Sequence, residues 1–283
     1  MADYQSTVIL GDLRFSEGPR WRDGKLWFSD MWGYQVMTVD PDGNAETIVH
    51  VPGRPSGLGW RPDGTLLIVS MQDRKLMRHV PPDGLEEVAD LSSVATWHTN
   101  DMVVDARGRA YVGNLGSDIL ADGGVSTATI ALVTEDNEVH EAADGLEFPN
   151  GTVITPDGRT LIVAESRGRR LTAFDVADDG GLSGRRVFAD LGEVVPDGIC
   201  LDTEGGVWVS NPLAPEVVRV LDGGEVTDRV TTEHNTYACM LGGEDGRTLY
   251  ICSADGEEAD RVAGRSSAFI EVVEVAVPHA GLP

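Results

Sequence analysis

Six short segments along the chain share one pattern of polar and hydrophobic positions. Each begins with a charged residue followed by glycine and continues into a run of mostly β-branched, aromatic or other apolar residues. The charged residue and glycine are typical of a tight hairpin turn, because glycine adopts positive φ without steric cost. The run that follows is typical of a buried β-strand. The turn glycines are spaced by 40 to 50 residues and are Gly24, Gly64, Gly108, Gly158, Gly205 and Gly246.

Six units of this length, with no convincing amphipathic helix between them, predict an all-β protein: a six-bladed β-propeller with four-stranded antiparallel blades. An apolar run at residues 7–10 precedes the first unit, and another at 268–277 follows the last. We expect these N- and C-terminal strands to share one blade and close the ring, which would hide the edges of an open sheet. No linker or shift in composition divides the chain, so residues 1–283 are expected to form a single domain.

Composition excludes several classes of partner. The formal net charge is −25, and only Lys25 and Lys75 are lysines, so a basic surface for nucleic acid or anionic lipid is not expected. No apolar run approaches the length of about 18 residues that a membrane span needs. The cysteines Cys200, Cys239 and Cys252 include no CxxC pair and are expected to be reduced core residues of a cytoplasmic protein.

Polar residues recur at one register of the repeat. Seven or eight positions before each turn glycine, where the innermost strand of a blade would begin, four of the six units carry a carboxylate or a carboxamide. Any one of them alone is equally typical of turn chemistry. Together they would converge on the central channel, where clustered carboxylates need a compensating cation. Oxygen ligands suit Ca²⁺, Mg²⁺ or Mn²⁺ better than structural Zn²⁺. These residues are Glu17, Asn100 with Asp101, Asn150 and Asp197.

The same positions lie in phrases that resemble the SMP-30/gluconolactonase/LRE-like family, and the resemblance runs in order along essentially the whole chain. It implies a six-bladed propeller of metal-dependent hydrolases, mostly lactonases, with phosphotriesterase-type relatives such as diisopropyl fluorophosphatase. The phrases are Ser16-Glu17-Gly18-Pro19-Arg20-Trp21, Asn100-Asp101 with Asp105, Pro149-Asn150-Gly151, Pro196-Asp197-Gly198 with Asp202, and the segment from Cys239 to Tyr250.

Carried over position by position, the resemblance implies that Glu17, Asn150 and Asp197 bind one divalent cation. We expect Ca²⁺, with Zn²⁺, Mn²⁺ and Mg²⁺ as alternatives. It also implies that Asp197 is the candidate general base and that Asn100 contacts the substrate or joins the metal ligands. His98 stands where sugar lactonases of the family often have arginine, and this departure argues against a sugar lactone more than against hydrolysis itself.

Further candidates for substrate binding are His98, Asp101, Trp32, Trp97 and Tyr237. Asp101 is the weaker candidate for assisting the base, because alternation along a strand turns it away from Asn100. The aromatic residues fit a cavity wall or the ordinary packing of a rim. The segment 114–127 lies in the longest interval between turns and fits either a lid or a surface loop.

The sequence therefore predicts a metal-dependent lactonase, a carboxylic ester hydrolase whose partner is a small-molecule lactone or ester. Three alternatives remain open: a phosphotriesterase that uses the same metal, a non-catalytic propeller that only binds partners, and a family member that catalyses another step on its metal. The pattern does not determine the number of subunits.

Overall fold

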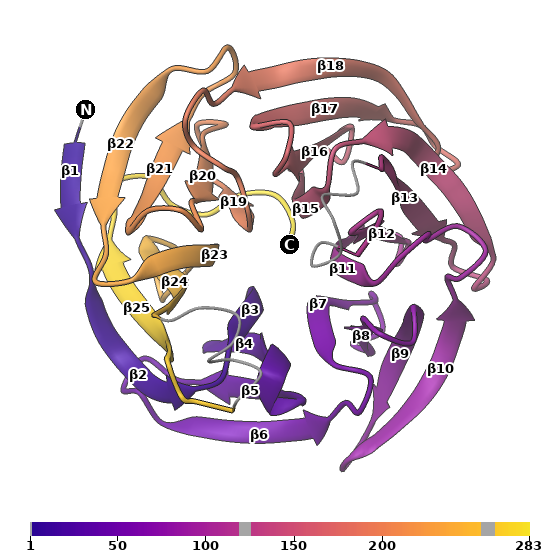
Figure 1. Cartoon of the computed structure of the whole chain (residues 1–283), viewed down its shortest axis with the longest axis horizontal. Coiled ribbons are helices and arrows are strands. Elements are labelled where there is room, and N and C mark those ends of the chain that lie inside the picture. Colours follow the sequence, from indigo (N-terminus) through magenta and orange to yellow (C-terminus); the bar gives the residue numbers. More distant parts are fainter. Residues whose placement is uncertain (1, 119–125, 256–263) are drawn as a thin grey trace.

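Six small sheets surround a central axis in the computed structural model, which describes residues 2–118, 126–255 and 264–283 (Figure 1). In each sheet the strands follow one another from the axis outward, so the innermost strand of every blade lines the centre. The 3-10 turn η1 (Met31–Gly33) is the helical element of the described residues. None of the helical structure described there is long and apolar enough to cross a membrane. The predicted six-bladed β-propeller is confirmed.

The strands of the blades are given from the axis outward. The first three blades contain β3 (Ser16–Arg22), β4 (Lys25–Asp30), β5 (Gln35–Val39) and β6 (Ala45–His50); β7 (Pro55–Trp60), β8 (Leu66–Ser70), β9 (Lys75–Val80) and β10 (Gly84–Asp90); and β11 (Thr99–Val104), β12 (Ala110–Asn114), β13 (Ala128–Val133) and β14 (Val139–Leu146). The last three contain β15 (Pro149–Ile154), β16 (Thr160–Glu165), β17 (Arg170–Val176) and β18 (Leu182–Asp190); β19 (Ile199–Leu201), β20 (Val207–Ser210), β21 (Glu216–Val220) and β22 (Val226–Thr231); and β23 (Asn235–Gly242), β24 (Thr248–Ala254), β25 (Ala268–Glu274) and β2 (Thr7–Leu13).

The repeated glycines form the turns that the sequence predicts. Each lies between the first and second strands of its blade, and all six have φ between +71° and +91°. Because an L side chain is strained in this region, glycine is the residue that permits these turns.

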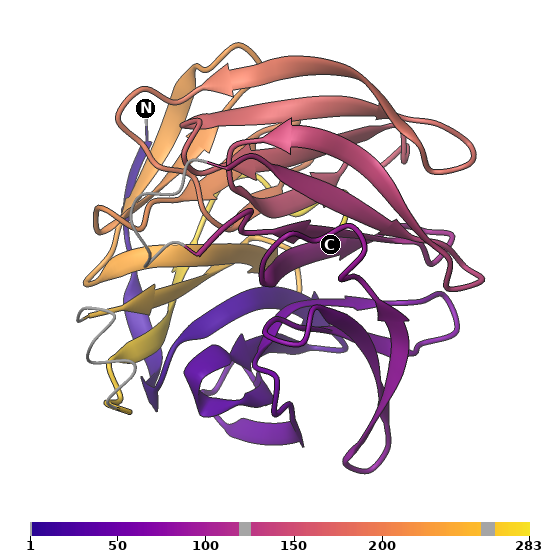
Figure 2. The same cartoon turned by 45° about the vertical axis from the view of Figure 1, so that its right-hand side comes forward.

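Two strands close the ring at its outer edge. β2 pairs antiparallel with β25, so the N- and C-terminal segments share the sixth blade as expected. β1 (Ala2–Gln5) was not expected: it pairs parallel with β22 and gives the fifth blade an additional strand, which lies beside the N-terminus in the second view (Figure 2). Without β1, the outer edge of β22 would present unpaired backbone groups.

Glycines that follow the axial polar residues serve packing rather than turn formation. Gly151 lies inside β15, and a Cβ there would be 2.5 Å from the backbone nitrogen of Ile199. A Cβ on Gly198 would be 2.4 Å from the Cβ of Ala238. The inner strands therefore approach one another so closely that a side chain has no space, and the ordinary turn interpretation of Asn150-Gly151 is wrong.

The three cysteines are buried and free, as expected of core residues. Cys200 and Cys239 lie on the neighbouring inner strands β19 and β23, with their Sγ atoms 3.8 Å apart.

Candidate active site

A cavity of about 690 Å³ lies where the inner strands begin. All six blades contribute to its wall, and its size is that of a small-molecule site. Two places in the repeat supply most of the lining: the start of the inner strand and the loop after the second strand. The lining residues are Phe15, Glu17, Met31, Trp32, Arg54, Met71, Trp97, His98, Asn100, Leu115, Asp118, Phe148, Asn150, Ser166, Arg167, Arg169, Val195, Asp197, Pro212 and Tyr237.

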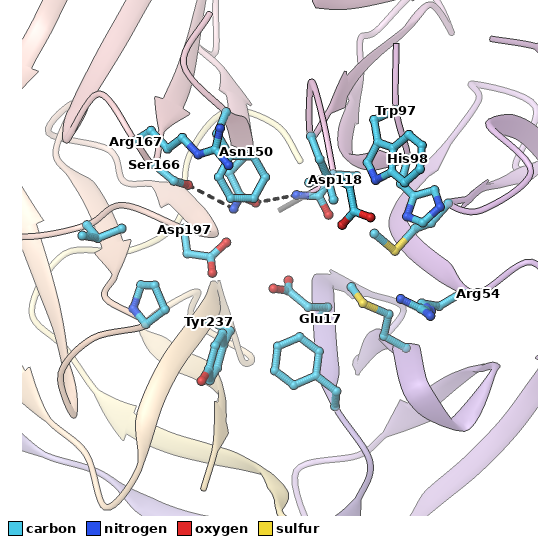
Figure 3. Close-up of a pocket in the computed structure, with 18 of the residues that line it drawn as sticks. Glu17, Arg54, Trp97, His98, Asp118, Asn150, Ser166, Arg167, Asp197 and Tyr237 are labelled. Carbon is cyan, nitrogen blue, oxygen red and sulfur yellow. Dashed lines mark hydrogen bonds between the residues drawn. The ribbon is translucent and has the colours of Figure 1, made fainter. Parts of the chain in front are cut away.

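Three oxygen-bearing side chains from different blades meet in this cavity (Figure 3). Glu17 is the second residue of β3, Asn150 is the second residue of β15, and Asp197 precedes β19 by two residues. The carboxylates of Glu17 and Asp197 point toward one another across the cavity, with the amide of Asn150 beside them. All three residues are at least nine-tenths buried. The structure thus brings together the residues that the resemblance implies as metal ligands.

The electrostatics of this group favour a cation. Burial raises the pKa of Glu17 well above its usual value, and the charge of Asp197 raises it further. The backbone N–H of Gly18 donates a 3.0 Å hydrogen bond to Glu17 Oε2, which acts in the opposite direction. A divalent cation between the two carboxylates would remove the repulsion that burial makes costly.

The donor set also fits a hard divalent ion. In the described part of the chain no three His, Cys, Asp or Glu side chains form a metal cluster, because the third member here is an amide. Two carboxylates and a carboxamide oxygen are ligands that Ca²⁺ accepts, with water completing its coordination.

A chain of hydrogen bonds orients Asn150. Asn100 Nδ2 donates to Asn150 Oδ1 over 2.9 Å, and Asn150 Nδ2 donates to Ser166 Oγ over 3.2 Å. Ser166 Oγ in turn donates to the carbonyl of Pro196 over 2.7 Å, next to Asp197. Since an amide oxygen has two lone pairs, Asn150 Oδ1 accepts the bond from Asn100 and retains one lone pair for a metal.

Asp101 lies outside the cavity lining. Its Oδ1 accepts a 2.7 Å hydrogen bond from Arg20 Nη2 in a buried ion pair. Arg20 also donates to the carbonyl oxygens of Pro19, Leu58 and Met102. Asp101 lies where the register of β11 shifts, between Thr99 and Met102, and it pairs with an arginine instead of lining the cavity, although its charge also raises the pKa of Glu17.

The remaining candidates all line the cavity. The ring of Trp97 stacks on that of His98, with the ring centroids 4.8 Å apart. Tyr237 contacts Phe15 edge-on, with the ring centroids 4.7 Å apart. The pKa of His98 is lowered, first by burial and then by the charge of Arg54, so the ring is neutral at pH 7 and serves as a hydrogen-bonding group. Trp32, from η1, completes the aromatic wall.

A second ring of lining residues lies two positions before the axial ones, and of its members the sequence pointed only to His98. All five precede the inner strand of their blade, so the signal that could have found them is their constant distance of nine or ten positions from the turn glycine. The ring consists of Phe15, Arg54, His98, Phe148 and Val195. Of the segment 114–127, Leu115 and Asp118 border the cavity, whereas residues 119–125 lie outside the described residues.

Known proteins are similar to this chain in sequence and in fold. Residues 15–255 match the model of the SMP-30/gluconolactonase/LRE-like region. The chain belongs to this family. Regucalcin from Danio rerio is 32% identical over 278 residues, covering 92% of this chain and 90% of that protein. Pentonolactonase XacC from Haloferax volcanii is 25% identical over 281 residues, covering 95% and 94%.

A solved structure has the same fold. It is described as a calcium-binding protein, regucalcin, from Agrobacterium tumefaciens, and it has a TM-score of 0.78 at 21% identity, covering 99% of both chains. At this identity the likeness supports the fold alone.

Proposed function

We propose that this family member is a divalent-metal-dependent lactonase. The observation that carries the proposal is the group formed by Glu17, Asn150 and Asp197, whose oxygens converge in a cavity of small-molecule size. The name of the relative pentonolactonase XacC supports a lactone as the substrate.

Glu17, Asn150 and Asp197 would hold the cation, and Ca²⁺ is the ion we propose, because two carboxylates and a carboxamide oxygen are ligands that it accepts. When bound, a divalent cation supplies polarisation of the lactone carbonyl and stabilisation of the oxyanion that forms when water attacks.

The side chains of the chain itself provide the rest of the chemistry. Asp197 accepts a proton from the attacking water as the new C–O bond forms at the carbonyl carbon. Cleavage of the ring C–O bond then releases an alkoxide, and the carboxyl proton of Asp197 returns to it, which gives the hydroxy acid. Asn100 donates one amide N–H to Asn150 and has a second for a substrate oxygen. Neutral His98 contributes a further hydrogen bond, and Trp97 and Tyr237 hold the apolar body of the substrate.

The decisive experiment measures lactone hydrolysis in a pH-stat, with protein stripped by EDTA and resupplied with Ca²⁺, Mn²⁺, Mg²⁺ or Zn²⁺. We expect activity to disappear on stripping and to return with Ca²⁺. Asp197→Asn preserves the shape of the side chain, removes the base and one anionic ligand, and is expected to lower kcat at least 100-fold. Asp83→Asn, an exposed position distant in sequence from the site residues, is the matched control and retains activity.

Each other outcome favours another function. Hydrolysis of a phosphotriester such as paraoxon, with every lactone left intact, favours the phosphotriesterase. A rise in melting temperature with Ca²⁺ but no hydrolysis of either class supports the metal site and contradicts the lactonase. Absence of both responses favours a binding scaffold.

A further inference from the structure

Arg54 occupies the position of the second lining ring where other blades carry Phe15, Phe148 and Val195. It precedes β7, and its guanidinium stacks on the indole of Trp32, with Cζ 3.7 Å from the ring centroid. Figure 3 shows its side chain reaching toward the cavity near His98. The stacking fixes the plane of the guanidinium and leaves its N–H edge for a ligand.

The backbone at Arg54 is in a conformation that favours glycine. Its φ is +72°, and Phe148, at the same position of the fourth blade, has φ of +64°. A side chain other than glycine is strained there, and such strain is concentrated at functional sites. Both of these strained residues place their side chains in the cavity wall.

The hydrogen-bonding capacity of Arg54 is not used by the fold. Among the residues that the structure describes, Arg54 forms no ion pair, and its Nε is buried without a hydrogen-bond partner. By contrast, Arg20 directs its guanidinium to one carboxylate and three carbonyls. A guanidinium that is held in place by an aromatic ring but keeps free donors is suited to binding an anion.

The charge of the cavity differs from that of the whole chain. Acidic residues outnumber Lys and Arg by 47 to 22 in the sequence. In the lining, Arg54, Arg167 and Arg169 equal in number the carboxylates Glu17, Asp118 and Asp197. Because Arg169 pairs with Glu193 outside the lining, a divalent cation on Glu17 and Asp197 would leave the cavity with an excess of about one positive charge.

From these observations we infer that the substrate is a lactone that carries a carboxylate on an apolar body, and that Arg54 binds this carboxylate while Trp32, Trp97 and Phe148 contact the apolar part. The inference deepens the proposed lactonase function and rests on it for the reacting group. The planar fork of a guanidinium matches the two oxygens of a carboxylate, which gives Arg54 the role of a specificity residue.

The activity test compares two γ-butyrolactones that differ in one group, a phenyl or a carboxyphenyl substituent. For the wild type, kcat/KM is expected to be at least tenfold higher for the carboxyphenyl lactone. In Arg54→Met this preference falls at least tenfold, mainly through KM, and Arg54→Lys restores part of it because the charge returns without the fork. Arg186→Met, which removes an exposed arginine of β18 that pairs with Asp222, leaves the preference unchanged.

A binding test separates this inference from the lactonase proposal. EDTA-treated protein is titrated with hydrocinnamate and with hydrocinnamide by calorimetry, so that no metal can hold the carboxylate. The acid is expected to bind at least tenfold more tightly than the amide, and Arg54→Met abolishes the difference. If no lactone is hydrolysed but hydrocinnamate still depends on Arg54, the lactonase proposal fails and the anion site stands. Equal binding of acid and amide, absence of binding, or an equal loss on both lactones in Arg54→Met overturns the inference.

Discussion

At the scale of single residues, burial shifts the pKa values of two titratable side chains of the site, Glu17 and His98. Glu17 faces Asp197 in a buried position, and its pKa is raised by burial and by that neighbouring charge. His98, also partly buried, has a lowered pKa and is neutral at pH 7. The carboxylates thus destabilise the metal-free protein and are available for a cation, whereas the histidine adds no positive charge to compete with it.

Glu17→Gln tests, through the pH dependence of stability, how far the buried charge of Glu17 destabilises the metal-free protein. Since the pKa of Glu17 is higher in the folded metal-free protein than in the unfolded chain, the folded state binds the proton more tightly, and stability falls as pH rises through the raised pKa. Because the glutamine of Glu17→Gln does not ionise, this fall in stability with rising pH is absent from the variant. We expect its metal-free form to melt a few degrees above the wild type at pH 8 and at the same temperature as the wild type at pH 4, measured by calorimetry.

The same variant should lose stabilisation by Ca²⁺, because it lacks one anionic ligand. A variant that melts below the wild type at both pH values would contradict the repulsion between Glu17 and Asp197.

At the scale of elements, the inner strands carry two kinds of residue on their two faces. Side chains on one face line the cavity, as that of Asn100 in β11 does. Side chains on the other face form buried contacts between blades, as that of Asp101 does with Arg20 of β3. Arg20 connects β3 with β7 and β11 through three hydrogen bonds. The relative positions of the strands that carry the site therefore depend on this arginine.

Arg20→Met should destabilise the protein by about 3–5 kcal/mol, because it leaves the charge of Asp101 buried without a partner. The double variant Arg20→Met, Asp101→Leu should recover part of this loss, since both charges are then absent. Urea unfolding measures both values. If the loss of unfolding free energy in the double variant equals the sum of the losses in Arg20→Met alone and Asp101→Leu alone, the two side chains are not coupled.

Ser166→Ala interrupts the hydrogen bonds that link β15 to the segment before β19. We expect Ca²⁺ affinity to fall about tenfold, because Asn150 loses the acceptor that orients its amide. The matched control is Ser253→Ala on β24, where a fully buried hydroxyl donates to Glu271 Oε1 over 2.6 Å. Calorimetric titration of both variants should show the loss only at Ser166; an equal loss at Ser253 would indicate a general effect of destabilisation.

At the scale of the whole molecule, closure of the ring fixes the geometry of the site. The sixth blade joins β2 to β25, which are more than 250 residues apart, and its inner strand β23 carries Tyr237 into the cavity. β1 contributes differently, since it extends the fifth blade at its outer edge and is mostly exposed.

Two truncations separate these roles. Removal of residues 1–5 should retain the fold and lower the melting temperature by only a few degrees, because β1 buries little surface. Removal of residues 1–13 exposes the edge of β25 and deletes the buried Leu13, so we expect aggregation and a large loss of folded protein. Light scattering and thermal unfolding measure the difference; equal stability of the two truncations would contradict closure by β2.

Much of the fold follows from local chemistry. Turn glycines at regular intervals, each followed by a strand-forming run, determine the repeat and the register of the inner strands, since both depend on neighbouring residues. Glu17, Asn100, Asn150 and Asp197 were therefore predictable as axial residues from their distance to the turn. The register also predicted that Asp101 faces away from Asn100.

Other features arise only from packing between blades. The partner of Asp101 is an arginine 81 positions earlier, and the hydrogen bond between Asn100 and Asn150 joins residues 50 positions apart. The stacking of Arg54 on Trp32 and its unused donors likewise depend on how the first two blades meet. By itself the sequence determined the number of blades and the residues at the axis, because these follow from periodicity. Only the tertiary structure decided which side chains share the cavity and how they are charged, because those properties depend on contacts between distant segments.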